Sequence, residues 1–341
     1  PVQFSSSISQ TKQFLYNPAT RNADKSRNFN ITGLTLGIAK KLSVPDDYFV
    51  LSQAISVQYY DLNNYNTGLF TFGNGNSNNL AYTVGLSRNN TFNDPIYPIG
   101  GSSFNLSAKF SFPYSAVSDI DYSALKKERD DQYDIISQNS NSSSQEEVDM
   151  RNAASERIGE IDQQRFKWLE FYKIKFKGEW YTKIAGQLVL KPTFEFGFLG
   201  AYNNDRGVIP FERFFLGGDG LGTYSLDGRE AIALRGYPNQ SLSTQDGGSI
   251  YNKFSLELRH PITLAQQTKI FALAFMEGGN SYNDFNNFNP FNLKRSAGIG
   301  LRIFMPAFGL LGIDFGHGFD PLPGEATKSG WQTHFIIGQQ F

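Results

Sequence analysis

The sequence predicts an all-β chain, folded as an antiparallel barrel whose strands have one apolar and one polar face. In the last eleven residues the apolar side chains share one parity, at Trp331, Phe335, Ile337 and Phe341. Gln332, His334 and Gln340 take the other parity, as expected for a strand whose successive side chains point to opposite faces. A final strand that ends on an aromatic residue is typical of outer-membrane barrels, where the ring lies at the lipid–water boundary.

The same alternation recurs along the chain. In residues 103–112 the even positions are apolar and the odd ones polar, and in residues 172–180 Lys173, Lys175, Lys177 and Glu179 alternate with apolar residues. A soluble sandwich would have to bury these charges, whereas a barrel with a watery lumen would not. About twelve strands are predicted: 2–14, 31–42, 50–60, 80–88, 103–112, 172–180, 190–200, 251–259, 269–277, 297–304, 310–316 and 331–341.

Composition narrows the class of protein. The 341 residues carry a formal net charge of −1 and have a mean hydropathy of −0.38, which alone would indicate a soluble protein. Barrel strands, however, are apolar on one face only. The sequence has no apolar run of the ~18 residues that a spanning helix needs. The near-zero charge gives no footprint for nucleic acid, and the lack of cysteine excludes disulfides and thiolate sites.

The connections alternate between long and short. If the last strand ends in the periplasm, the long connections fall outside the cell, at 16–28, 61–78, 114–167, 204–249, 278–293 and 317–330. The others fall inside, at 43–47, 89–101, 185–187, 260–266 and 305–309. This arrangement of long outer loops and short inner turns is typical of bacterial outer-membrane barrels.

Connection 114–167 is much longer than a strand link requires. It holds a charged stretch, a Ser/Asn run and a segment in which Ser144 and Glu147 could form a helix-capping box. A thin apolar stripe follows, at Val148, Ala154, Ile158 and Ile161. Two interpretations remain open: a solvated or disordered loop, and an ordered helical hairpin that docks a partner on the cell surface.

Connection 204–249 is predicted to fold back into the lumen. Phe211, Phe214, Phe215 and Leu216 make it too apolar to extend into water. Arg235 would then need a carboxylate partner inside the barrel. Strand parity points Glu257 inward, and Glu195 is a further candidate. Parity does not decide whether Glu277 points inward, because the apolar residues Phe271, Leu273 and Phe275 lie on the same face of the strand.

Two motifs in this connection resemble the BamA family of barrel-assembly and secretion translocators. The first comprises Pro210, Phe211, Glu212, Arg213, Phe214, Gly217 and Gly218, and the second is Arg235, Gly236 and Tyr237. The resemblance continues through 255–261, 275–279, 295–302 and 335–341, and before residue 210 it rests mainly on topology. The insert 114–167 departs from the compact loop of familiar members.

The resemblance carries several expectations. The family barrel has sixteen strands, so this chain would supply about the last twelve, with the first four strands and the periplasmic POTRA domains preceding Pro1. Glu257 and Glu277 would both face Arg235. Gly338 resembles a family glycine at which the last strand bends away, which would leave residues 339–341 without a neighbouring strand.

No enzyme, metal site or cofactor is expected. His260, His317 and His334 are too scattered to form a metal-ligand set, and no nucleophile–base pair is evident. Residues 217–222 are rich in glycine but lack the lysine of a phosphate-binding loop.

Three functions remain open. One is an assembly machine whose first and last strands pair weakly and template client β-barrels at the seam. The second is a secretion translocator of the same family, and the third a passive channel, which gains nothing from a loop arginine beside a lumenal acid. The first implies client barrels, accessory lipoproteins and the lipid bilayer as partners, and a surface partner on 114–167 would add to them.

Overall fold

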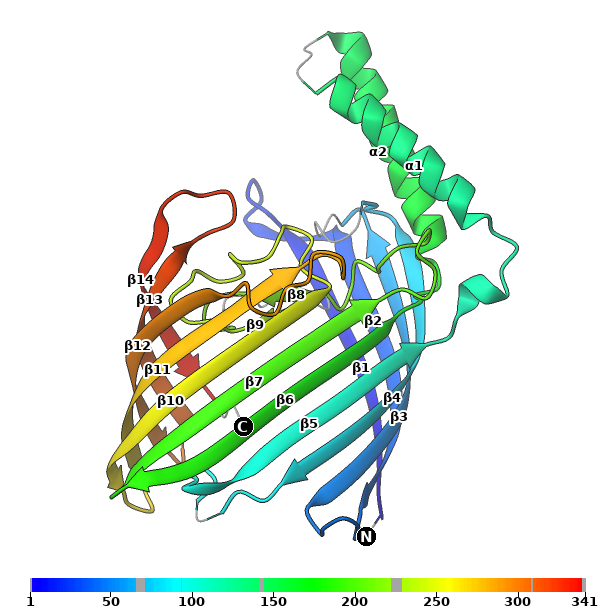
Figure 1. Cartoon of the computed structure of the whole chain (residues 1–341). Coiled ribbons are helices and arrows are strands. Elements are labelled where there is room, and N and C mark those ends of the chain that lie inside the picture. The colour runs from blue at the N-terminus through cyan, green and yellow to red at the C-terminus, as the bar shows by residue number, and fades with distance from the viewer. Residues whose placement is uncertain are drawn as a thin grey trace.

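A computed structural model of the chain describes residues 2–65, 71–92, 94–140, 144–221, 229–307 and 309–338. In this part of the chain, twelve strands form one antiparallel sheet that curls into a barrel wall, and each pairs with the next in sequence order (Figure 1). They are β1 (Val2–Asn17), β2 (Asn22–Lys41), β3 (Phe49–Asn63), β4 (Gly75–Asn89), β5 (Gly100–Ser111), β6 (Tyr172–Ala185), β7 (Leu188–Gly200), β10 (Ile250–Leu264), β11 (Lys269–Tyr282), β12 (Lys294–Met305), β13 (Gly309–Pro321) and β14 (Lys328–Ile337). The predicted all-β barrel is confirmed.

The strands are longer than the alternation predicts. Segment 16–28 was expected to be an outer loop, but β1 runs to Asn17 and β2 begins at Asn22, which leaves a turn of four residues. That prediction is wrong because residues 22–27 are largely polar and show no alternation, although residues 22–24 still pair with β1 beyond a bulge at residues 25–27. The connection predicted at 317–330 likewise shortens to 322–327.

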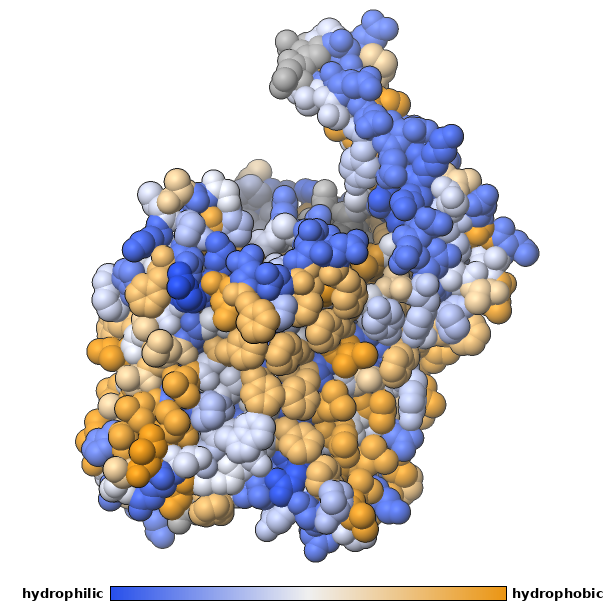
Figure 2. Space-filling view, in the orientation of Figure 1, coloured by the Kyte–Doolittle hydropathy of each residue, from blue (hydrophilic) through white to orange (hydrophobic). Residues whose placement is uncertain are grey.

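The outer face of the wall is apolar. Leu36, Ile55, Met276 and Phe335 are all more than half exposed, and Figure 2 shows an apolar band across the strands between polar rims. A band of this kind needs lipid rather than water against it. Among the described residues, the helices fall short of the length and apolarity needed to cross a membrane.

Two connections of the chain fold into the lumen, as predicted for loop 204–249. One apolar cluster joins loop 204–249 to the wall, and within it β8 (Phe214–Leu216) pairs in parallel with β9 (Glu230–Ile232). A second cluster lies nearer the opposite rim, where Tyr97, from the connection between β4 and β5, packs on Phe271 of β11 with 5.2 Å between ring centroids. The barrel is therefore blocked by its own connections.

Insert 114–167 is an ordered helical hairpin that rises above one rim (Figure 1). After a short 3₁₀ turn (Tyr114–Ala116), α1 (Tyr122–Gln138) and α2 (Gln145–Arg165) pack antiparallel. The side chain of Ser144 accepts a hydrogen bond from the amide of Glu147, as the predicted cap requires. Of the two interpretations left open for this insert, a disordered loop and a helical hairpin, the structure shows the helical hairpin.

The apolar stripe of the hairpin is used within the chain. Ile158 is 2% exposed and Ile161 is 1% exposed, and the outer surface of both helices is hydrophilic (Figure 2). Ile158 and Ile161 are therefore already buried within the chain and are not available to the surface partner that was expected to bury them. Val148 is only partly buried, so a surface partner on the insert stays a prediction. The burial of Ile158 and Ile161 follows from packing between the helices and against the connection from β3 to β4, where Gly159 lies close to Thr71 and Phe72.

Candidate functional site

The segment Pro210–Gly218 forms the buried centre of loop 204–249. Phe211 and Phe214 are fully buried against Tyr60 of β3 and Tyr251 of β10, with ring centroids 4.3 and 4.7 Å apart. Gly217 follows at a φ of 127°, where a Cβ would lie 2.6 Å from the carbonyl oxygen of Pro238. The aromatic residues thus hold the loop on the wall, and the glycine permits its close return past Pro238.

The two charged residues of this segment have different partners. Arg213 donates to the carbonyl oxygens of Ile209 and Val208, at 3.0 and 3.2 Å, and so fixes the preceding turn. Glu212 reaches the wall instead and forms ion pairs with Lys109 of β5 and Lys173 of β6. Burial by itself raises the pKa of Glu212, but the charges of Lys173 and Lys109 outweigh it and lower the pKa to about 2.

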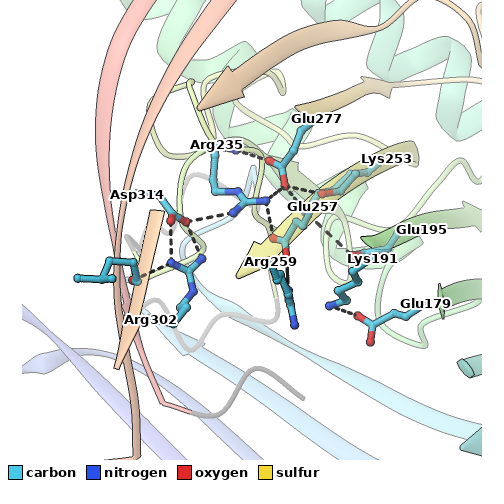
Figure 3. A network of polar contacts seen from close by, with 12 residues as sticks. Glu179, Lys191, Glu195, Arg235, Lys253, Glu257, Arg259, Glu277, Arg302 and Asp314 are labelled. Carbon is cyan, nitrogen blue, oxygen red and sulfur yellow. Dashed lines mark hydrogen bonds and ion pairs between the residues drawn. The ribbon is translucent and has the colours of Figure 1, made fainter. Parts of the chain in front are cut away.

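Arg235 is the centre of a buried ion-pair network, which we call the latch (Figure 3). Its Nη2 lies 2.8 Å from Glu257 of β10 and 2.6 Å from Glu277 of β11, and its Nη1 lies 3.2 Å from Asp314 of β13. Its backbone amide also donates to Glu277, at 2.8 Å. One loop residue thereby joins three strands of the wall.

Other cations share the carboxylates of the latch. Arg259 pairs with Glu257 at 2.5 Å, and Arg302 donates to both oxygens of Asp314 at 2.7 and 2.8 Å. Lys253 lies farther from Glu277, at 3.9 Å. Burial opposes the charge of Arg235, but Glu277 and Glu257 outweigh this effect and raise its pKa. Buried charges are tolerated when they are paired and hydrogen-bonded in this way.

The position of Glu277 resolves what parity left open. Phe271, Leu273 and Phe275 do share its parity, and all three are buried in the lumen, whereas Met276 is 63% exposed on the outer face. The guanidinium carbon of Arg235 lies 3.7 Å from the centroid of the Phe275 ring. On β11 the apolar residues of the Glu277 parity therefore face inward, because they pack there against other lumenal residues of the chain.

The residues after Arg235 bind the last strand. The amide of Gly236 donates to Nε2 of His334 on β14 at 2.9 Å, and its carbonyl oxygen accepts from Ser329 at 2.8 Å. The hydroxyl of Tyr237 donates to the carbonyl oxygen of Arg295 at 2.7 Å. All three residues of the motif thus contact the wall, from β10 to β14.

Among the described contacts Glu195 does not pair with Arg235, but it is linked to the latch through Lys253, which lies 3.9 Å from Glu277. It forms long ion pairs with Lys177 and Lys253, at 3.9 and 4.0 Å (Figure 3). Sequence reasoning instead missed Asp314 and His334. The polar parity of His334 beside Gln332 already pointed inward, but a strand pattern cannot say which residue of a distant loop arrives opposite.

The end of β14 matches its pattern as far as the structure describes it. Phe335 and Ile337 are 55% and 63% exposed on the outer face, opposite the buried His334. Gly338 has a φ of 99°, and its amide still donates to the carbonyl oxygen of Leu310 at 2.9 Å. Phe341 and the predicted free end at 339–341 lie outside the described residues.

A first prediction concerns Lys173, whose ammonium group lies 2.9 Å from Glu212 and 2.7 Å from Glu230. Lys173→Met should destabilise the pairing of β8 with β9 by about 1 to 3 kcal/mol, because both carboxylates lose a buried partner. The measurement is hydrogen exchange at the Glu230 amide, which donates to the carbonyl oxygen of Arg213. Lys183→Met, at an exposed position of the same strand, is the control. Equal exchange in the two variants would contradict the prediction.

Fold and latch together define a class of protein: a β-barrel with an apolar outer band, whose lumen is occupied by a loop pinned to its last strands. The chain belongs to the Omp85 superfamily, because the model of the Omp85 superfamily domain matches residues 1–341.

Solved structures support this assignment at the level of the fold. BamA from Haemophilus ducreyi lacking POTRA domains 1–3 is similar with a TM-score of 0.58 at 15% identity, over 98% of this chain and 58% of that one. CdiB from Escherichia coli is similar with a TM-score of 0.51 at 12% identity, over 98% of this chain and 49% of that one. The chain thus spans about half the length of these two structures. A search of curated proteins gave no match.

Proposed function

We propose that this barrel inserts and folds client β-barrel proteins in the bacterial outer membrane, as the central subunit of an assembly machine that works with accessory lipoproteins. The observation that carries the proposal is the attachment of the lumenal loop to β14 itself, through Gly236, His334 and Ser329. The role is mechanical, so it requires neither a catalytic residue nor a cofactor.

The proposed mechanism uses the loop as an internal brace. β14 forms its ladder with β13 on one side. Its other edge is the one that would meet the first strand of the whole barrel across a weakly paired seam. A strand edge offers backbone groups that can pair with an incoming strand. Loop 204–249 fixes the position of this edge from inside the barrel while a client strand adds to it from the membrane.

A passive channel is disfavoured by the contents of the lumen. Phe211, Phe214, Leu216 and Leu234 are fully buried there, which no open water-filled passage would permit. The loop that carries them is held by the latch as well. An arrangement that blocks its own pore is better suited to positioning strands than to free diffusion.

Cysteine crosslinking tests the proposal, and the chain offers a clean background because it has no cysteine of its own. A cysteine at Phe335, on the outer face of β14, should crosslink to a client barrel stalled during insertion. A cysteine at Met276, equally outward but on β11, should not. Absence of the Phe335 crosslink while insertion proceeds would refute the proposed seam.

Secretion of a client through the lumen is the second candidate. A cavity of about 150 Å³ lies beside the latch, lined by charged residues that include Lys177, Glu179, Lys191 and Lys253. Such a lining would suit the passage of an unfolded polar chain once the loop had moved. In that case a cysteine at Lys177, rather than at Phe335, would crosslink to the stalled client.

A further inference from the structure

Residues at the base of the helical hairpin contact the start of loop 204–249. The guanidinium of Arg206 lies 5.2 Å from the ring centroid of Tyr122, the first residue of α1, and its Nη1 donates to Glu170 at 2.9 Å. Arg206 and Glu170 are 1% and 0% exposed. Glu170 is held in turn by the amide and hydroxyl of Ser115, at 2.6 and 2.7 Å. The contact is therefore a buried ion pair in which both oxygens of Glu170 accept hydrogen bonds, whereas Nε of Arg206 has no hydrogen-bond partner among the described residues.

The other helix contacts the same place. Arg165, the last residue of α2, donates to the carbonyl oxygen of Arg206 and pairs with Asp162 at 2.6 Å. Gly207 has a φ of 79°, and a Cβ on it would lie 2.9 Å from Nη2 of Arg165. From α1, Lys126 adds an ion pair with Asp205 at 3.3 Å. Both helix ends therefore converge on residues 205–207.

The hairpin is itself fixed to the barrel wall. The hydroxyl of Thr71 donates to Asp162 at 2.7 Å, and the side-chain amide of Gln163 donates to the carbonyl oxygen of Asn76 at 3.2 Å. Only a short, buried segment then separates Arg206 from the aromatic centre of the loop, since Ile209 and Phe211 are both 0% exposed. Because this segment is short, a movement of the hairpin base would be transmitted to β8.

We propose that the base of the hairpin is a second anchor of loop 204–249, with Arg206 and Arg165 as its positioning residues. The loop is then held at both ends: at its start by the insert 114–167 and near its end by the latch. Insert 114–167 is a structural part of the lumenal machinery, and tilting the hairpin from the cell surface would shift the loop inside. The anchor goes beyond the proposed function, and only its effect on client insertion rests on that function.

Hydrogen exchange of the purified protein tests the anchor. The amides of Gly217 and Gly218, which donate to the carbonyl oxygens of Ile232 and Leu234, report on the loop. Arg206→Met should speed their exchange at least about tenfold, because Glu170 is left buried without its cation. Arg206→Lys, which keeps the charge, should restore most of the protection. Unchanged exchange in Arg206→Met would overturn the proposal.

Matched variants separate the anchor from general damage to the hairpin. Arg157→Ala removes an exposed pair with Glu128 on the same hairpin and should leave the loop amides unchanged. Replacing residues 137–147 by a short glycine-rich turn removes the tip but keeps the base, and it should also leave them unchanged. If Arg206→Met does not fold, Tyr122→Leu replaces it, with about threefold faster exchange expected. Faster exchange after loss of the tip alone, or none in Tyr122→Leu, would refute the anchor.

Client insertion, measured on the same variants, tests the proposed function separately. If Arg206→Met loosens the loop amides and slows insertion, both the anchor and the proposed function are supported. If the amides loosen while insertion continues at the normal rate, the anchor stands and the proposed role of the loop in insertion is wrong. The two failures are therefore distinguishable.

Discussion

Replacing Arg235 by alanine is expected to release the loop from the wall and to cause a large local loss of stability. The side chain is 8% exposed and contacts three carboxylates on three strands. Removing it leaves Glu257, Glu277 and Asp314 buried with too little positive charge, since only Arg259 and Arg302 remain as their close arginine partners. Breaking a buried pair in this way costs about 3 to 5 kcal/mol.

The measurement is hydrogen exchange at the amides of Gly217 and Gly218, together with client insertion in cells that depend on the variant. Both amides should exchange faster and insertion should fall. Arg88→Ala is the control, because Arg88 of β4 pairs with one acid, Asp46 in the connection between β2 and β3, at 2.7 Å and has no contact with loop 204–249 among those described. If these amides exchange as slowly in Arg235→Ala as in Arg88→Ala, the latch does not hold the loop in place.

Much of the fold follows from alternation, and its limits have a physical cause. On β10, Phe254, Leu256 and Leu258 face outward and Glu257 inward, as the period of two requires. The alternation marks a strand only where lipid lies on one side and the lumen on the other. Outside the lipid-facing band, as at residues 22–27, both faces of the strand are largely polar, so the sequence pattern does not show that the strand continues.

The candidate site was predictable only in part. A loop arginine demands buried acids, so Glu257 could be found from parity, and Glu277 followed from the family resemblance. Asp314 and His334 meet the loop through the curvature of the wall, and one-strand patterns hold no information on which distant residues that curvature brings together. The anchor at Arg206 was missed for the same reason, because Glu170 lies just after a helix that no strand pattern describes.

Gly236 connects the latch to the seam, since it contacts β14, as does Asp219, whose carboxylate accepts from the amide of Phe335 at 3.3 Å. Its φ is 87°, a conformation that favours glycine, and a Cβ on it would lie 2.8 Å from Cβ of Ser296 and 3.0 Å from the backbone nitrogen of Gly318. Neither neighbour can move easily, because both belong to the sheet. A side chain at this position therefore pushes the loop away from β12 and β13.

Gly236→Ala should accordingly destabilise the seated loop by about 2 to 6 kcal/mol, from backbone strain and overpacking together. The hydrogen bonds to His334 and Ser329 should be lost with it, so the amide of residue 236 should exchange faster and client insertion should decline. Gly330→Ala is the matched control: that glycine of β14 has a φ of 75° but open space around its Cβ, so it carries the strain without the clash and should cost only about 1 to 2 kcal/mol. Equal effects of the two substitutions would show that the contact between Gly236 and the wall is not what positions the loop on the last strand.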